Sequence, residues 1–201
     1  MQLRYWPTSP YARKVRIVLI ETGLDKRVEL VATNPWAADT DLGNDNPVGK
    51  VPTLIDDDGH RVFDSDVICD YLDGMHGGAR LIPVEGRARL VALTRQALGD
   101  GILDAAILRR IEMTMRPEAL HWDWWLDRQK AVVRRGLERL EAEAAKLTDF
   151  ATIGDIAAAC ALGYLDFRFG TEEWRSGHPI LAAWFERQLK RPSMVATVPP
   201  N

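Results

Sequence analysis

The chain has few cysteines, no long apolar run and no excess of basic residues. Its two cysteines, Cys69 and Cys160, lie within apolar patterns of helical spacing, which favours two buried thiols over a disulfide. No apolar run approaches the roughly 18 residues of a membrane-spanning helix, and no signal segment opens the chain. The formal net charge of -3 offers no basic surface for nucleic acid. We therefore expect a cytoplasmic protein with no membrane or nucleic-acid partner.

The histidines are also few and scattered. The four of them show no spacing typical of metal ligands, so no metal site is expected; they are His60, His76, His121 and His178. What the chain does contain suits a soluble globular protein, with 46% hydrophobic and 27% charged residues. Its 201 residues are enough for one large domain or two small ones.

The first part of the chain predicts a strand, a helix and a second strand. Residues 2–6 alternate like a strand, an amphipathic helix runs from Pro10 to a stop at Gly23, and residues 28–31 form the next strand. Ser9 is placed to cap that helix, and Pro10 takes the first helical position, which tolerates a missing N–H. Three such elements in about thirty residues predict a βαβ unit.

A hairpin and another helix complete the first domain. Residues 51–55 and 61–63 predict two strands joined by an acidic turn, and residues 65–73 predict a helix. The order βαβ and then ββα is that of a thioredoxin-like α/β domain, which we place at residues 1–78. Gly77 and Gly78 end this domain, and residues 79–85, which include Pro83, then form a linker.

Beyond the linker every periodic segment is helical. The expected helices cover residues 87–115 and 122–147, a segment that begins at Thr152, and residues 179–189. Thr152 and Asp155 match a capping box in which Asp replaces the usual Glu. Residues 86–201 are therefore predicted to form an all-α domain.

Two positions of the hairpin offer unbonded polar groups: the entrance of its first strand and the residues that follow its second strand. Pro52 has no N–H to give to a strand ladder, so it is best placed at a strand entrance, where it leaves the backbone of Val51 unpaired. An unpaired backbone can bind an extended peptide. Asp64 and Ser65 stand where a helix begins, so side-chain acceptors and unbonded N–H groups meet there. A hairpin between two helices, without any ligand, is the alternative.

Together these motifs resemble the glutathione S-transferase (GST) family, over the whole chain. The resemblance is nearest to short bacterial members with Thr-Ser-Pro at the first helix, the YibF-like group, and the capping box at Thr152 is a further family hallmark. It implies a cis peptide bond before Pro52 and pairing of Val51 with the cysteinyl backbone of glutathione. It also implies that Asp64 and Ser65 bind the γ-glutamyl end.

Ser9 is the candidate catalytic residue under this resemblance. A thiol with a pKa of about 8.5 is mostly protonated at neutral pH, and a hydroxyl donor at a helix N-terminus can stabilise its anion. A plain N-cap is the alternative role of Ser9, and Thr8 and Tyr5 are the rival donors. Because no cysteine stands at this turn, conjugation is favoured over thiol exchange.

The resemblance suggests further contacts to glutathione. Lys50 stands where many members carry a glutamine, and its cation could pair with the glycyl carboxylate, although a solvated turn lysine is an equal alternative. The two long helices expose more apolar positions than one small helical domain can cover, so we expect a homodimer. The first long helix forms the dimer interface in this family. Asp100, or less readily Asp104, could then reach the ligand of the partner subunit, against the alternative of an exposed helix charge.

A second, electrophilic substrate is expected between the domains. Its candidate contacts are Tyr11, Arg109 and Met113, with Trp122 and Trp125 as further wall residues, although tryptophans at helical spacing more often belong to a core. The doublet Arg109-Arg110 is most simply a solvated helix face.

These expectations define a function and its alternatives. The chain is predicted to bind glutathione and to conjugate its thiolate to a small electrophile, as a serine-type glutathione S-transferase. The alternatives are a GST-fold adaptor that binds a protein partner, and a glutathione carrier without turnover. The sequence does not identify the electrophile.

Overall fold

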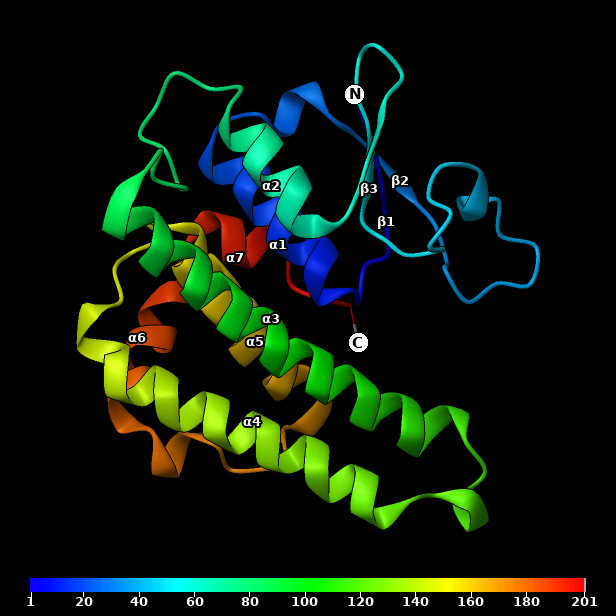
Figure 1. Cartoon of the computed structure of the whole chain (residues 1–201), viewed down its shortest axis with the longest axis vertical. Helices are drawn as coiled ribbons and strands as arrows, with labels where there is room; N and C mark the ends of the chain where they lie inside the picture. The colour runs from blue at the N-terminus through cyan, green and yellow to red at the C-terminus, as the bar shows by residue number, and fades with distance from the viewer. Residues whose placement is uncertain (201) are drawn as a thin grey trace. The chain divides into compact units, whose positions relative to one another are not determined.

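The computed structural model describes residues 1–200 and divides them into two compact units. The first unit contains residues 1–84 and the C-terminal residues from Arg191 onward, and the second contains residues 85–190. Figure 1 labels the helices and strands of both units.

The first unit is built on a mixed four-stranded sheet. Its strands are β1 (Gln2–Tyr5), β2 (Glu29–Ala32), β3 (Thr53–Ile55) and β4 (Arg61–Val62), in the order β2-β1-β3-β4. β1 is parallel to β2 and antiparallel to β3, and β3 is antiparallel to β4. The predicted thioredoxin-like order, βαβ followed by ββα, is therefore confirmed (Figure 1).

Two helices of this unit follow the expected capping signals. α1 (Pro10–Glu21) begins after Ser9, whose hydroxyl accepts a hydrogen bond from the backbone N–H of Ala12. α2 (Ser65–Asp73) begins after Asp64, whose carboxylate accepts from the backbone N–H of Asp66. Their inward faces bury the residues that pack the core of this unit: Val15, Val18, Leu19, Ile68 and Leu72.

The C-terminal segment adds a helix that the sequence patterns did not predict. α7 (Pro192–Ala196) lies in the first unit, whereas the sequence prediction assigned all of residues 86–201 to the helical domain. The carboxylate of Glu21 accepts hydrogen bonds from the Arg191 guanidinium at 2.7 Å and from the Ser193 hydroxyl at 2.5 Å. The guanidinium of Arg13 donates to the carbonyl of Met194 at 3.2 Å. These polar contacts and the burial of Met194 hold the segment to α1.

The second unit is all-helical, as predicted. It contains α3 (Gly86–Met115), α4 (Asp123–Glu143), α5 (Ile153–Phe169) and α6 (Pro179–Gln188). α3 and α4 run side by side in opposite directions, and α5 packs along α3 (Figure 1). Short 3-10 turns occur in the two units at Asp25–Arg27, Leu42–Asn44, Glu118–Leu120, Ala144–Lys146 and Arg175–Gly177. Within residues 1–200, no helix is both long and apolar enough to cross a membrane.

The start of α5 is held by a buried carboxylate. Asp155 is fully buried, and it accepts a hydrogen bond from the backbone N–H of Thr152, which completes the predicted capping box. The same carboxylate accepts from the guanidinium of Arg95 at 2.8 Å and from the hydroxyl of Thr148 at 2.7 Å. Because a buried charge is costly unless it is paired and hydrogen-bonded, this arrangement fixes α5 against α3.

A second buried carboxylate closes the end of α2. Asp73 is fully buried and accepts hydrogen bonds from the backbone N–H groups of Leu81 and Ile82, at 2.7 and 3.0 Å. Arg80 donates to it at 2.8 Å, and a ring nitrogen of His76 lies 3.1 Å away. Burial acts to raise the pKa of Asp73, but these donors outweigh it and hold the pKa below the usual value for aspartate.

This lowered pKa predicts a loss of stability in acid. An unfolded aspartate titrates near pH 3.9, roughly, so Asp73 stabilises the fold fully above that pH and progressively less as pH falls towards its folded pKa. Asp73→Asn should therefore lower the free energy of unfolding at pH 7 and flatten its decrease between about pH 5 and 3. Urea unfolding at several pH values measures both effects. An unchanged acid slope in the variant would contradict the assignment, and Asp70→Asn, on an exposed position of the same helix, is the control.

Candidate functional site

Three segments meet at one end of the sheet. In the β1–β3 pairing Arg4 lies opposite Thr53, so the residues that follow β1 are next to those that precede β3. In the β3–β4 pairing Leu54 lies opposite Val62, so the residues that follow β4 are at the same end. The start of α1, the turn before β3 and the start of α2 are therefore neighbours, and we treat them as the candidate site.

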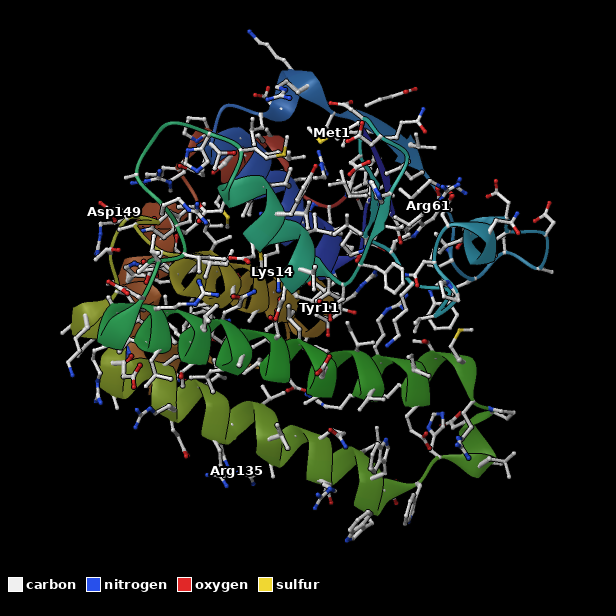
Figure 2. All side chains as sticks on the ribbon, turned by 45° about the horizontal axis from the view of Figure 1, so that its top comes forward. Met1, Tyr11, Lys14, Arg61, Arg135 and Asp149 are labelled. Atoms are coloured by element: carbon white, nitrogen blue, oxygen red, sulfur yellow. The ribbon has the colours of Figure 1, made fainter. Side chains whose placement is uncertain are left out.

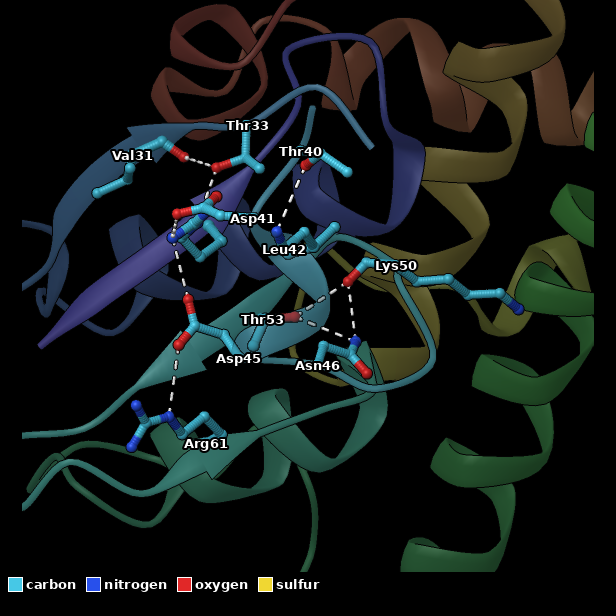
Figure 3. A network of polar contacts seen from close by, with 11 residues as sticks. Val31, Thr33, Thr40, Asp41, Leu42, Asp45, Asn46, Lys50, Thr53 and Arg61 are labelled. Carbon is cyan, nitrogen blue, oxygen red and sulfur yellow. Dashed lines mark hydrogen bonds and ion pairs between the residues drawn. The ribbon is translucent and has the colours of Figure 1, made fainter. Parts of the chain in front are cut away.

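The turn before β3 is held by the side chain of Asn46. Asn46 is 2% exposed, and its amide nitrogen donates to the Lys50 carbonyl at 2.9 Å and to the Thr53 hydroxyl at 3.1 Å (Figure 3). Its amide oxygen accepts from the backbone N–H of Val48 at 3.0 Å. The Thr53 hydroxyl in turn donates to the Lys50 carbonyl at 3.0 Å. The backbone that leads into Val51 is thus fixed at several points.

A charged network anchors the same loop to the sheet. Arg4 on β1 donates to the hydroxyl of Thr33 at 2.9 Å and pairs with Asp45 at 3.0 Å and also with Asp41 (Figure 3). The carboxylate of Asp45 also forms an ion pair with the guanidinium of Arg61 on β4, at 3.4 Å. No sequence pattern predicted this network, because its members lie on four separate segments.

The backbone of Val51 remains available to a ligand. The Val51–Pro52 peptide bond is cis, as the family resemblance implied. The β3 ladder begins at Thr53, and the backbone of Val51 forms no hydrogen bond with any other residue in the described range 1–200. Both the N–H and the C=O can therefore pair with an extended peptide.

The start of α2 presents unsatisfied polar groups. One carboxylate oxygen of Asp64 caps the helix, while the residue itself is exposed. The hydroxyl of Ser65 makes no hydrogen bond within residues 1–200, although the residue is only 5% exposed. The hydroxyl oxygen is not one of the fully covered polar atoms without a partner, so water or a ligand can reach it and bond to it.

At the start of α1 the structure shows Ser9 as an N-cap with a donor still unused. Its oxygen accepts from Ala12 at 3.2 Å, and its own O–H has no acceptor among the described residues. Thr8 is half-buried and makes no hydrogen bond within the same range. The ring of Tyr5 lies 5.2 Å from the guanidinium carbon of Arg16, two helical turns beyond Ser9.

Lys14 connects α1 to α2, and sequence reasoning missed it. Its side chain is fully buried, and its ammonium pairs with the carboxylate of Asp66 at 2.6 Å. Lys14 and Tyr11 project from the same helix, with the ammonium 6.0 Å from the centre of the Tyr11 ring (Figure 2). A lysine on the apolar face of an amphipathic helix was the available signal. The ion pair positions the start of α2, directly beside Ser65.

Three further predicted site residues lie in the turn before β3 and on α3: Lys50 in the turn, and Asp100 and Asp104 on the helix. The carbonyl of Lys50 is part of the Asn46 network, and its exposed side chain extends away from that network without an ion pair among residues 1–200 (Figure 3). Asp100 is half-buried and Asp104 is exposed, both on α3. Their contact with a partner subunit stays a prediction.

The residues predicted to contact a second substrate differ in how many interactions they already make within the protein. Arg109 is 5% exposed, pairs with both carboxylate oxygens of Glu172 at 2.5 and 3.2 Å, and lies over the ring of Phe169. It is therefore not the solvated helix residue that the sequence favoured. Met113 is half exposed. Trp122 stacks on Trp124 and Trp125, with ring centres 4.9 and 6.4 Å apart.

One group of potential metal ligands lies in the hairpin turn. Oxygen or nitrogen atoms of Asp56, Asp58 and His60 fall within 4.8 Å of one another. The carboxylate of Asp56 accepts from the backbone N–H groups of both Asp58 and His60, which lowers its pKa, the His60 bond being the largest cause. This pattern is that of an ordinary Asp-stabilised turn, and we assign no metal to it.

The fold and this site define a class of protein: a thioredoxin-like domain whose sheet ends in an unpaired backbone segment at Val51, together with a helical domain. Comparison with known families agrees. The model for the glutathione S-transferase N-terminal domain matches residues 8–75, and the model for the glutathione S-transferase C-terminal domain matches residues 125–187. The chain belongs to the glutathione S-transferase family.

Several relatives resemble the chain over nearly its full length. The uncharacterized GST-like protein YibF of Escherichia coli K12 is 35% identical, over 96% of each chain. A glutathione transferase family member from Pseudomonas fluorescens Pf-5, solved with bound glutathione, is 50% identical with a TM-score of 0.95, over 100% of this chain and 99% of that one. A second structure from that organism, with bound S-(propanoic acid)-glutathione, is 48% identical with a TM-score of 0.93, over 100% of both chains.

The Asn46 network makes a testable prediction about stability. Asn46→Ala removes three hydrogen bonds and leaves the Lys50 carbonyl and the Val48 N–H with fewer partners, so it should lower the free energy of unfolding by about 1–3 kcal/mol. Asn44→Ala, at an exposed position of the same loop, should cost less than about 0.5 kcal/mol. Urea denaturation of both variants is the measurement, and equal losses would show that the amide does not hold the turn.

Proposed function

We propose that this protein binds glutathione at the candidate site and conjugates its thiolate to a small electrophile. The observation that supports this most strongly is the unpaired backbone of Val51 beside the unsatisfied hydroxyl of Ser65, at one end of the sheet. These groups suit an extended peptide with a free α-carboxylate. Relatives from Pseudomonas fluorescens, about half of whose residues are identical, hold glutathione and S-(propanoic acid)-glutathione.

Each end of glutathione has a proposed partner. Val51 pairs with the cysteinyl backbone, as a strand would. Ser65 and the N-terminus of α2 bind the γ-glutamyl carboxylate, which the helix dipole also favours, and the exposed carboxylate of Asp64 accepts from the γ-glutamyl amine. The ammonium of Lys50 pairs with the glycyl carboxylate.

Ser9 is the proposed catalytic residue. Its hydroxyl has an unused donor and stands at the N-terminus of α1, so both the O–H and the helix dipole can stabilise a thiolate. Tyr5 is less suited, because its ring is engaged with Arg16. Arg109 is committed to Glu172, so we now propose Tyr11 and Met113 ahead of Arg109 as contacts of the electrophile.

We further propose that the protein is a homodimer. Leu90 and Val91 on α3 are 58% and 44% exposed, and with Leu98 they line a hollow of about 380 Å³ whose lining also includes the charged Arg87, Arg139 and Glu143. An exposed apolar surface rimmed by charges is typical of an interface. Asp100 lies on the same helix, which keeps its proposed contact with the partner's ligand consistent.

Glutathione binding is tested by calorimetry and thermal melting. Ser65→Ala should weaken binding by about ten- to a hundredfold, the cost of one hydrogen bond to a charged group, and Asp64→Ala should act similarly. Ser176→Ala, at an exposed serine of the helical unit, is the matched control. At a hundred times Kd, glutathione should stabilise the wild type by about 2.7 kcal/mol. Absence of any shift would overturn the proposal and favour an adaptor that binds a protein partner.

The role of Ser9 is tested through the thiolate. Ser9→Ala should raise the pKa of bound glutathione by about 1–2 units and slow conjugation near neutral pH by about ten- to a hundredfold, with little change in affinity. Ser9→Gly should do the same with a smaller loss of helix capping. Thiolate absorbance against pH is the measurement, with Thr8→Ala and Tyr5→Phe as comparisons. A shift only in Tyr5→Phe would make this a tyrosine-type enzyme, and binding without turnover would make it a carrier.

The dimer is tested by sedimentation. The wild type should sediment at twice the 22.6 kDa of the chain, and Leu90→Glu should sediment as the monomer, because the new charge would be buried in the interface. Leu120→Glu, which changes another exposed leucine of the same unit, should remain dimeric. A wild-type monomer at micromolar concentration would also remove the proposed role of Asp100.

A further inference from the structure

Two arginines of the helical unit are brought together by the packing of α3 against α5. The helices touch closely at their glycines: a Cβ at Gly99 would lie 2.8 Å from the carbonyl carbon of Ala157. The offset between Gly99 and Ala157 is 58 positions, and the same offset separates Arg110 on α3 from Arg168 on α5. Since the two helices run in the same direction, this offset places the two guanidinium groups as neighbours near the far end of the pair.

These two half-buried arginines lack the carboxylate partners that three other partly or fully buried arginines of this unit have. Arg95 pairs with Asp155, Arg109 with Glu172, and Arg175 with Asp166. Neither Arg110 nor Arg168 forms an ion pair within residues 1–200, although both are half-buried. Burial, and then the neighbouring charge of Arg110, lower the pKa of Arg168. Two adjacent, partly desolvated cations without a counterion are unfavourable, and an anion between them would offset that cost.

Arg168 is also held in position for a ligand. Its guanidinium stacks on the ring of Phe167, 3.8 Å from the ring centre. Because the guanidinium N–H groups point outward in its plane, stacking leaves them able to form hydrogen bonds. Its Nε–H is covered and has no acceptor in the described part of the chain. The Tyr164 hydroxyl is close enough to Arg168 to hydrogen-bond to it. Burial raises the pKa of Tyr164, against the opposing effect of the two arginines, so this phenol keeps its proton at neutral pH and can donate it.

We propose that Arg110, Arg168 and Tyr164 form a binding site for the oxyanion group of a small acid, a carboxylate or a phosphate. Two guanidinium forks and one phenol are all donors, and they match the several acceptor lone pairs of such a group. The site lies within the helical unit and does not depend on glutathione binding by the other unit.

The test uses propanoate and inorganic phosphate as probes, at constant ionic strength. Either probe, or both, should bind the full-length wild type in a calorimetric titration, while neutral propanamide should not. Arg110→Met and Arg168→Met should each weaken that binding at least tenfold, and Tyr164→Phe should weaken it about threefold to tenfold. The control is Arg135→Met, an exposed arginine of α4, which should bind like the wild type (Figure 2). Circular dichroism confirms that each variant is folded.

Two further compounds identify where the oxyanion comes from. S-(2-carboxyethyl)glutathione and S-propylglutathione differ by a carboxylate. A loss of affinity in Arg168→Met for the first alone would show that the acid arrives attached to glutathione. A loss for free propanoate or phosphate, with both conjugates unaffected, would show that a free acid occupies the site. If neither probe nor conjugate distinguishes Arg110→Met and Arg168→Met from Arg135→Met, the proposal is overturned, whether or not the wild type binds glutathione.

Discussion

The candidate site depends on the buried amide of Asn46. Its two N–H groups and its oxygen bond to three positions of the turn that leads into β3, and so hold the backbone of Val51 clear of the β3 ladder. An extended peptide can pair there only because that strand begins two residues later, at Thr53. The Lys14–Asp66 ion pair acts similarly on the other side, where it fixes the start of α2 next to Ser65. Neither Asn46 nor Lys14 needs to touch a ligand; both determine where the ligand-binding groups lie.

Charge pairing has the same organising effect in the helical unit, where two half-buried arginines stand without a carboxylate partner among residues 1–200. Asp155 receives Arg95, Thr148 and the N–H of Thr152, so the first turn of α5 is fixed against α3 by a fully satisfied carboxylate. Further along the same pair of helices, Arg110 and Arg168 meet without a carboxylate in the described residues. Because two adjacent, half-buried guanidinium groups repel each other, an anion between them would offset that cost, as proposed above.

Local signals predicted the secondary elements well, because each signal concerns residues only a few positions apart. The capping signals predicted three helices: α1 from Ser9 and Pro10, α2 from Asp64, and α5 from the Thr152–Asp155 capping box. The structure contains all three. The same signals failed where a residue's partner was distant. Arg109 looked like part of a solvated doublet, yet its partner Glu172 lies 63 residues away and buries it. The C-terminal segment was assigned to the helical domain, because a short helical pattern does not indicate which surface it packs against.

The sequence by itself therefore determined the strand and helix order, the helix caps, the position of Pro52 at a strand entrance and, through these motifs, the family. Only the tertiary structure decided that Lys14 is buried against Asp66, 52 residues away, and that α7 joins the first unit through Glu21, 170 residues from Arg191. It also brought Arg110 near enough to Arg168 for its charge to lower the pKa of that residue. The physical reason is that capping and amphipathic periodicity act within a few residues along the chain. The burial and pairing of a charge depend instead on which segments the whole fold brings into contact.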